Sequence, residues 1–402
     1  MTGNTFNVKI KKSVFAWLIE SSGWSYNEIA NKIGISERIV SDWKSGKEEI
    51  EIPINKVEII SNTIKRPLAA FFISSPPKEP ELPKDFRKLP SNQVSSYSKE
   101  TLLSIRKARR LQKIGNKLLR TLDRPASGDI NQYSLSDNPE QVAILERGLS
   151  GISIKEQISW KDERVALSRW RNWAESKNIL VFQMKMPMED GRGFTLSDDL
   201  PYVIVLNHSD SIRGRLFSLF HEYAHILLKE PVICNFESNT SSNANIRKIE
   251  NWCDRFAGAF ILPKAELANE IGVLEKIKSG VISEGAKEIS RRYKISEQGA
   301  LVRLRNLNYI NIEQYGREYL RIVKEIEDYL KKKKEEESEK ERGGGLPGDK
   351  RCYVEKGEKF VSLVLESSNK GIISEPDAMD YLDIKVKNLV VSQDRLRSHR
   401  QQ

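Results

Sequence analysis

Two histidines four residues apart, with a glutamate directly after the first, lie in the segment GRLFSLFHEYAHILL at 214–228. On a helix, His221 and His225 project from the same face one turn apart, so both imidazoles can reach one Zn²⁺ at about 2.0–2.1 Å. Glu222 stands beside the first ligand, where its carboxylate can take a proton from a water molecule. The pattern therefore predicts a metal site with a general base.

A third ligand is available in the segment IENWCDRFAGAFILP, at 249–263, which predicts a second helix ending before a proline. Glu250 and Asp254 are four residues apart and share one face of that helix. Glu250 can complete a His₂Glu site that leaves a fourth position open, and Asp254 can accept the remaining N–H of a ligand histidine. We interpret Cys253 as a small core residue rather than a nucleophile.

Two histidines and a carboxylate favour Zn²⁺, with Mn²⁺ and Fe²⁺ as alternatives. Hydrolysis of an amide also needs a group that stabilises the oxyanion. The nearest candidates in the sequence are His208, Tyr202, Arg213 and Tyr223, of which we prefer His208 as a second catalytic residue.

The body that must position these residues spans 99–315. Buried-strand patterns at Ile179–Met184 and Tyr202–Leu206 stand on either side of a GRGF sequence, interpreted as a turn at Gly191–Phe194. The rest is predicted to be helical, beginning with a basic helix over Lys99–Arg124. The fold class is therefore mainly α with a small β-sheet.

Near the end of the body, EISRRYKISEQGA at 288–300 repeats the pattern of EIANKIGISERIV at 28–40. The repeat predicts a helix–turn–helix-like element near 286–307, with chance similarity as the alternative. A charged helix and a Gly-rich linker follow at 316–345, and residues 346–402 are predicted to form a small helical appendage.

Residues 1–75 are predicted to form an all-helical unit, joined to the body by a Pro-rich linker at 76–98. Ser25 and Glu28 have the spacing of a capping box, and Gly34 stands where the chain must turn. The apolar face of the helix pair is expected from Ile29, Ile33, Ile39, Val40 and Trp43. This pattern resembles the Cro/repressor (XRE-type) helix–turn–helix.

The resemblance implies duplex DNA as a partner, and a homodimer, because such modules often work in pairs. The positions implied to contact DNA are Glu37, Arg38, Ser41, Asp42 and Lys44. Two of them are acids, which repel phosphate, so a protein-docking module is the alternative.

The net charge of +10 is confined to residues 1–125, which hold 23 Lys/Arg and 13 Asp/Glu, whereas the remaining residues balance. A basic region attached to a neutral body suggests an anionic partner, with a surface kept basic for solubility as the alternative. Three widely spaced cysteines, no apolar run of membrane-spanning length and no hydrophobic signal region predict a cytoplasmic protein without membrane contact.

The stretch 204–263 resembles the ImmA/IrrE metallopeptidases, which pair HExxH with a downstream E-x-x-[AC]-[ND]-x-F-A sequence. The resemblance implies a zincin-like endopeptidase that cleaves a repressor or regulator protein at one site. It assigns His221, His225 and Glu250 to the metal and Glu222 to the base. Asp254 and Tyr223 depart from the residues frequent there, Asn and Leu.

Three hypotheses follow. The first is a site-specific endopeptidase with a DNA-targeting module. The second is a DNA-binding transcriptional regulator whose metal site is structural or sensory. The third is a peptidase whose N-terminal module recognises protein. The presence of Glu222 favours a peptidase, because a structural site needs no base.

Overall fold

The computed structural model describes residues 6–36, 38–39, 43, 48–79, 82, 97–228, 241–339 and 347–391, and only the backbone at 241–243, 326–327 and 329–339. The chain forms two compact units. The smaller unit holds the described residues within 1–83, 90–107 and 185–190, and the larger unit holds those within 84–89, 108–184 and 191–402. The predicted mainly α fold with a small sheet is confirmed.

The smaller unit combines helices with a two-stranded sheet. Its elements are β1 (Asn7–Lys11), α1 (Lys12–Glu20), α2 (Tyr26–Ile33), β2 (Glu49–Pro53), α4 (Ile54–Ile64) and the 3₁₀ helix η1 (Leu68–Phe72). The strands pair antiparallel, from Asn7 with Pro53 to Lys11 with Glu49. The prediction of an all-helical unit was therefore wrong. Alternation in these short strands turns Ile10, Ile50 and Ile52 into the core.

The predicted helix start and turn are present in this unit. Ser25 and Glu28 form the capping box of α2, and Gly34 follows it in the left-handed conformation at φ 65°. Ile29, Ile33 and Trp43 are buried, but Ile39 is 43% exposed and does not belong to the predicted apolar face. Val40 and most of the predicted linker lie outside the described residues.

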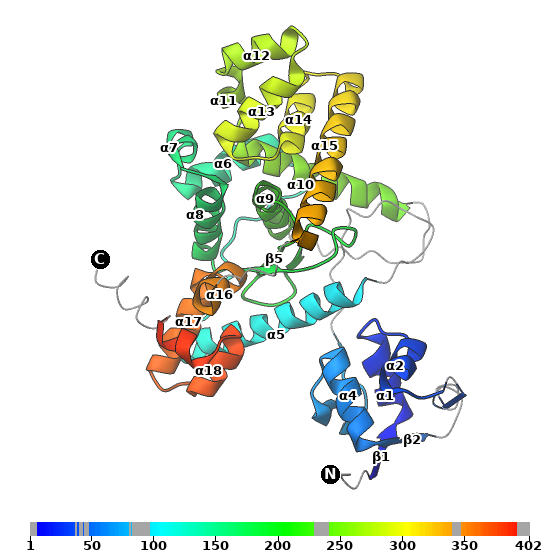
Figure 1. Cartoon of the computed structure of the whole chain (residues 1–402). Helices are drawn as coiled ribbons and strands as arrows, with labels where there is room; N and C mark the ends of the chain where they lie inside the picture. The colour runs from blue at the N-terminus through cyan, green and yellow to red at the C-terminus, as the bar shows by residue number, and fades with distance from the viewer. Residues whose placement is uncertain are drawn as a thin grey trace. The chain divides into compact units, whose positions relative to one another are not determined.

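The larger unit is a helical body around a three-stranded sheet (Figure 1). The strands are β3 (Leu180–Met184), β4 (Gly193–Leu196) and β5 (Val203–Asn207), in the order β3-β5-β4. β3 runs parallel to β5, and β4 runs antiparallel to it. The turn predicted at Gly191–Phe194 is therefore wrong, because β4 begins at Gly193 and Phe194 pairs with Val205.

The helices of this unit precede and follow the sheet. They are α5 (Lys99–Thr121, from Ala108 onward), α6 (Pro139–Ser150), α7 (Ile154–Ser159), α8 (Glu163–Ser176), α9 (Ile212–Leu228), α10 (Ser241–Ile261), α11 (Lys264–Ala268), α12 (Ile271–Lys278), α13 (Ile282–Tyr293), α14 (Glu297–Asn306), α15 (Ile312–Glu339), α16 (Gly348–Lys356), α17 (Glu358–Asn369) and α18 (Glu375–Leu382). Within the described residues, no helix has both the length and the apolar content needed to cross a membrane.

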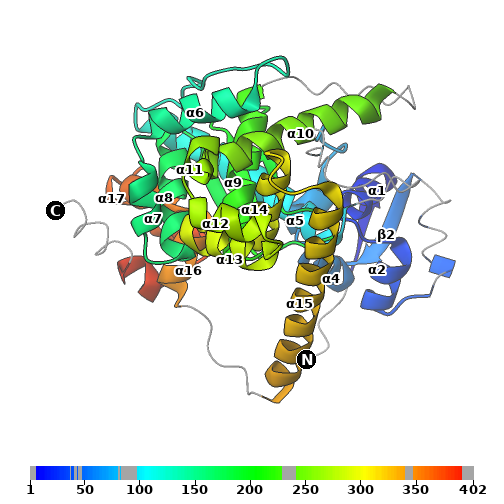
Figure 2. The ribbon, with the colours of Figure 1, turned by 90° about the horizontal axis from the view of Figure 1, so that it is seen from above.

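α9 lies at the centre of this unit, packed between α8 and α10 (Figure 2). It is buried nearly all round, as expected for a central helix. Trp170, Phe220 and Phe260, from α8, α9 and α10, form an aromatic cluster whose ring centroids lie 4.2–5.4 Å apart. This core fixes the two helices that carry the predicted ligands.

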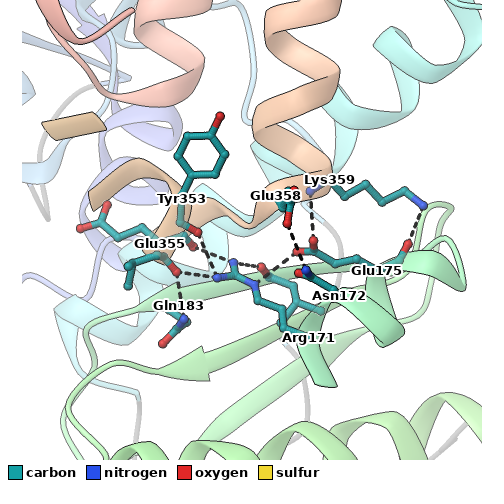
Figure 3. A network of polar contacts seen from close by, with 10 residues as sticks. Arg171, Asn172, Glu175, Gln183, Tyr353, Glu355, Glu358 and Lys359 are labelled. Carbon is teal, nitrogen blue, oxygen red and sulfur yellow. Dashed lines mark hydrogen bonds and ion pairs between the residues drawn. The ribbon is translucent and has the colours of Figure 1, made fainter. Parts of the chain in front are cut away.

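The C-terminal helices belong to the same body. The Arg171 guanidinium of α8 donates to the carbonyls of Val354 and Val181, so it joins α16 to the outer strand β3 (Figure 3). Glu175 accepts from the backbone N–H of Lys359 at the start of α17. The segment predicted as an appendage is therefore packed against the sheet.

Candidate metal centre

α9 brings His221 and His225 together on one face. Their Nε2 atoms lie 3.2 Å apart. The His221 side chain is fully buried and that of His225 is 19% exposed, so the two rings form the inner and outer parts of one site.

α10 contributes Glu250 to the same point. Its Oε2 lies 3.2 Å from Nε2 of His221, and its Oε1 lies 3.3 Å from Nε2 of His225. The three side chains form the group of potential metal ligands found among the described residues. Oε2 of Glu250 is buried, and its polar neighbour is Nε2 of His221 rather than water, as expected of an oxygen that serves a shared cation.

The spacing of these atoms fits a metal ion. Tetrahedral bonds of about 2.0–2.1 Å separate two ligand atoms by about 3.3–3.4 Å. The observed separations of 3.2, 3.2 and 3.3 Å are close to that value. Two imidazoles and one carboxylate are also a donor set that Zn²⁺ accepts, with a fourth position left for water.

The outer nitrogens of both imidazoles have their own partners. Nδ1 of His221 lies 2.8 Å from Oδ1 of Asp254, and Nδ1 of His225 lies 3.7 Å from the Cys253 sulfur. A proton on Nδ1 of His221 satisfies Asp254 and leaves the Nε2 lone pair for the metal. Cys253 is fully buried, and burial raises the pKa of its thiol.

The charges of the ligands are coupled. Burial opposes ionisation of Glu250, but hydrogen bonds from His221 and His225 outweigh it and lower the pKa of this carboxyl. Burial also opposes the charged form of His225, yet the contacts with Cys253 and Glu250 raise the pKa of the imidazole above its ordinary value. Without metal, the raised pKa of His225 favours the protonated imidazole in this cluster.

Glu222 follows His221 on α9 and is not part of the ligand group. It is 4% exposed, and its Oε2 accepts a hydrogen bond of 2.8 Å from Oγ1 of Thr195 on β4. A Cβ on Gly193 would lie 3.3 Å from Oε1 of Glu222 and 2.7 Å from the Val205 carbonyl, so this position needs glycine. No pattern in the sequence points to Thr195, because Gly193 and Phe194, the first residues of its strand, belong to the predicted turn.

The structure does not place His208 in the ligand cluster. This residue follows β5, is exposed, and has its Nδ1 3.4 Å from Nη1 of the buried Arg215. Its role as an oxyanion donor stays a prediction.

The other oxyanion candidates lie in different surroundings. The Tyr223 hydroxyl is buried and donates to Glu146 at 2.8 Å, so it is directed into the core. Arg213 donates to Ser290 Oγ and pairs with Glu163. Tyr202 is buried at 6% exposure.

Of the residues predicted to contact DNA, only Arg38 is described, and it is exposed. Glu37, Ser41, Asp42 and Lys44 lie outside the described residues.

Residues 174–305 match the peptidase family M78 model, described as the IrrE N-terminal-like domain. The matched region contains the sheet, α9, α10 and every residue of the metal centre. The match supports a metallopeptidase of the ImmA/IrrE type, and such an enzyme uses a metal ion. No curated protein matches the chain.

Proposed function

We propose that this chain is a metal-dependent, site-specific endopeptidase that cleaves a repressor or regulator protein. The observation that carries the proposal is the convergence of His221, His225 and Glu250 at ligand spacing, while Glu222, the residue after His221, is not one of the ligands. The family match over the same residues supports the peptidase class.

The three ligand residues would hold Zn²⁺, with Mn²⁺ or Fe²⁺ as alternatives. When bound, the ion polarises the scissile carbonyl and increases the acidity of the attacking water. Glu222 takes the proton of that water and later delivers it to the leaving amine. The Thr195 hydroxyl holds this carboxylate in position through the hydrogen bond described above.

β4 offers an edge along which an extended peptide can bind. In the β4–β5 ladder the Asn207 N–H donates to the Arg192 carbonyl, so Arg192 is a hydrogen-bonded position. Alternation then directs the backbone groups of Gly193 and Thr195 away from β5. A substrate strand added at this edge would run directly beside Glu222.

The smaller unit would target DNA through its helix–turn–helix, in a chain that works as a homodimer. The capping box of Ser25 and the left-handed turn at Gly34 support the module, and the exposed Arg38 is suited to a phosphate. A DNA-bound repressor would thereby be brought to the metal centre.

The second candidate function is a regulator whose metal site is only structural or sensory. Glu222 separates the two functions. A structural site is normally closed by a fourth ligand, whereas here the carboxylate of Glu222, next to His221 in the chain, is not a ligand and is held by Thr195.

The test compares Zn²⁺-loaded wild type with Glu222→Gln in a lysate of the source cells, with new protein N-termini labelled and sequenced. We expect a new terminus within a DNA-binding regulator with wild type alone. If both proteins bind one equivalent of Zn²⁺ and neither creates a new terminus, the peptidase proposal is wrong and the regulator is favoured.

A further inference from the structure

The exposed face of α5 carries a stripe of cations. Arg110, Lys113, Lys117, Arg120 and Arg124 are all exposed. Spacings of three and four residues place the first four on one side of α5, and Arg124 follows the end of the helix. From Arg110 to Arg120 the stripe covers about 15 Å along the helix axis. Asp123 is the single acid between Ala108 and Arg124.

The central cations of the stripe have no ion-pair partner. Arg110 pairs with Asp380, and Arg124 pairs with Glu366, so carboxylates neutralise the two ends. Within the described part of the chain, Lys113, Lys117 and Arg120 form no ion pair. Lys117 also attracts the Asp377 carboxylate of α18. The row nevertheless carries three cations without an ion pair among the described residues, and such a row favours a polyanion.

A helix–turn–helix lies beside the stripe, because α18 carries Asp380, the partner of Arg110. Ser374 and Asp377 form the capping box of α18, and Asp383 follows it in the left-handed conformation at φ 57°. The Ile384 N–H then donates to the Met379 carbonyl, and residues 386–391 are helical.

The same local geometry occurs in the smaller unit. There the left-handed Gly34 also stands nine residues after the capping serine, and the Ile35 N–H donates to the Ala30 carbonyl. Counted from the two turns, the positions matching Glu37, Arg38, Ser41 and Asp42 are Val386, Lys387, Val390 and Val391. All four are exposed.

A third such pair, α13 and α14, does not offer this surface. Lys294 provides its left-handed turn and Ser296 caps α14, but Leu301 and Arg303 on that helix are buried. Only the C-terminal pair combines an exposed second helix with neighbouring cations in the larger unit's described residues.

We propose that the larger unit binds duplex DNA through this surface, formed by the α5 stripe and the α18 helix–turn–helix. The central stripe cations, Lys385 and Lys387 contact phosphates, and the exposed valines face the groove. B-DNA has a major groove that admits a helix, whereas that of A-form RNA is too deep and narrow. This surface is independent of the metal centre and of the N-terminal module.

The test measures binding of the full chain to a 30-base-pair duplex of arbitrary sequence at several KCl concentrations. The variant Lys113→Glu/Lys117→Glu/Arg120→Glu should bind at least tenfold more weakly at low salt. Its slope of log K against log salt should be smaller by about 3, because each phosphate contact contributes about 0.9. Lys385→Glu/Lys387→Glu should reduce the slope by about 2.

The matched control is Lys155→Glu/Lys161→Glu/Arg169→Glu, which makes the same charge change at exposed positions on and beside α7 and α8. Zn²⁺ content and thermal unfolding of every variant show whether it is folded. If the two triple variants lose the same amount of DNA affinity, the loss comes from net charge alone and the proposal is wrong. If Arg38→Glu abolishes DNA binding and the α5 variant leaves it intact, DNA binds to the smaller unit alone. If duplex RNA binds with equal affinity, the choice of duplex DNA as the ligand is wrong.

Discussion

At the scale of single residues, the site divides into ligands, a base and groups that orient them. His221, His225 and Glu250 have atoms at ligand spacing, and Glu222 stands apart from them on the Thr195 hydroxyl. Substitution of a ligand should therefore abolish metal binding, whereas substitution of Glu222 should abolish catalysis and leave metal binding intact.

The metal content of purified variants tests which residues are ligands. Wild type and Glu222→Gln should each carry about one equivalent of Zn²⁺, and Glu250→Ala should lose it. Asp254→Ala should bind Zn²⁺ about 10–100-fold more weakly, because Asp254 orients His221 without touching the metal. Elemental analysis and competition with a chelator provide the values. Unchanged retention in Glu250→Ala would show that the ligand assignment is wrong.

The protonation of His225 gives the pH dependence of metal binding. Its raised pKa means that the metal-free imidazole keeps its proton through the neutral range, whereas binding requires the neutral form. Zn²⁺ affinity should therefore increase about tenfold per pH unit for each proton released, and continue to increase above pH 7. Chelator competition at pH 6–8.5 measures this dependence, and an affinity that is constant across that range would contradict it.

At the scale of elements, the sheet is held from two sides. α9 packs against β4 and β5, and α16 packs against β3. Gly357, between α16 and α17, has φ 81°, and a Cβ there would meet the Glu175 carboxylate. The buried pair Arg171–Glu175 and this close approach lock the C-terminal helices to α8 (Figure 3).

Gly357→Ala should therefore destabilise the larger unit by about 2–4 kcal/mol, from backbone strain together with the displaced carboxylate. Gly316→Ala is the control, because nothing lies within 4 Å of its added Cβ. In a helix interior that change should stabilise by about 0.5–1 kcal/mol. Denaturant unfolding compares the two variants, and equal stabilities would contradict the interpretation of Gly357.

The sequence predicted the ligand helices well because their spacing is a local property. α9 carries the histidine pair and α10 carries Glu250, as predicted from the spacing of these residues. The start of β4 was not predicted, because Gly191 and Gly193 are typical of a turn. The role of Thr195, on the same strand, was therefore not predicted either. The packing of α16 against the sheet could not be predicted either, because Arg171 and Glu175 have the i, i+4 spacing of an ordinary solvated ion pair.

At the scale of the whole molecule, each unit has its own hydrophobic core, one around Phe15 and Ile52 and one around Trp170 and Phe220. The metal ligands belong only to the second. Ligand binding should therefore stabilise one unit and not the other.

Calorimetry of the full chain should show two transitions, of which chelation with EDTA lowers only one. At a metal concentration about 1,000 times Kd the stabilisation is about 4 kcal/mol, which corresponds to a decrease of roughly ten degrees on chelation. His225→Ala should lack the shift. A single transition, or an equal shift in both, would contradict the independence of the units.

His225 and Glu250 lie on successive helices, 25 residues apart in the chain. A shared ion therefore closes a loop in the polypeptide, much as a disulfide does, and restricts the unfolded chain by about 3 kcal/mol on the scale used for such cross-links. Unlike a disulfide, this cross-link opens when the ion is withdrawn. The folded fraction of the larger unit should therefore follow the supply of free metal in the cell.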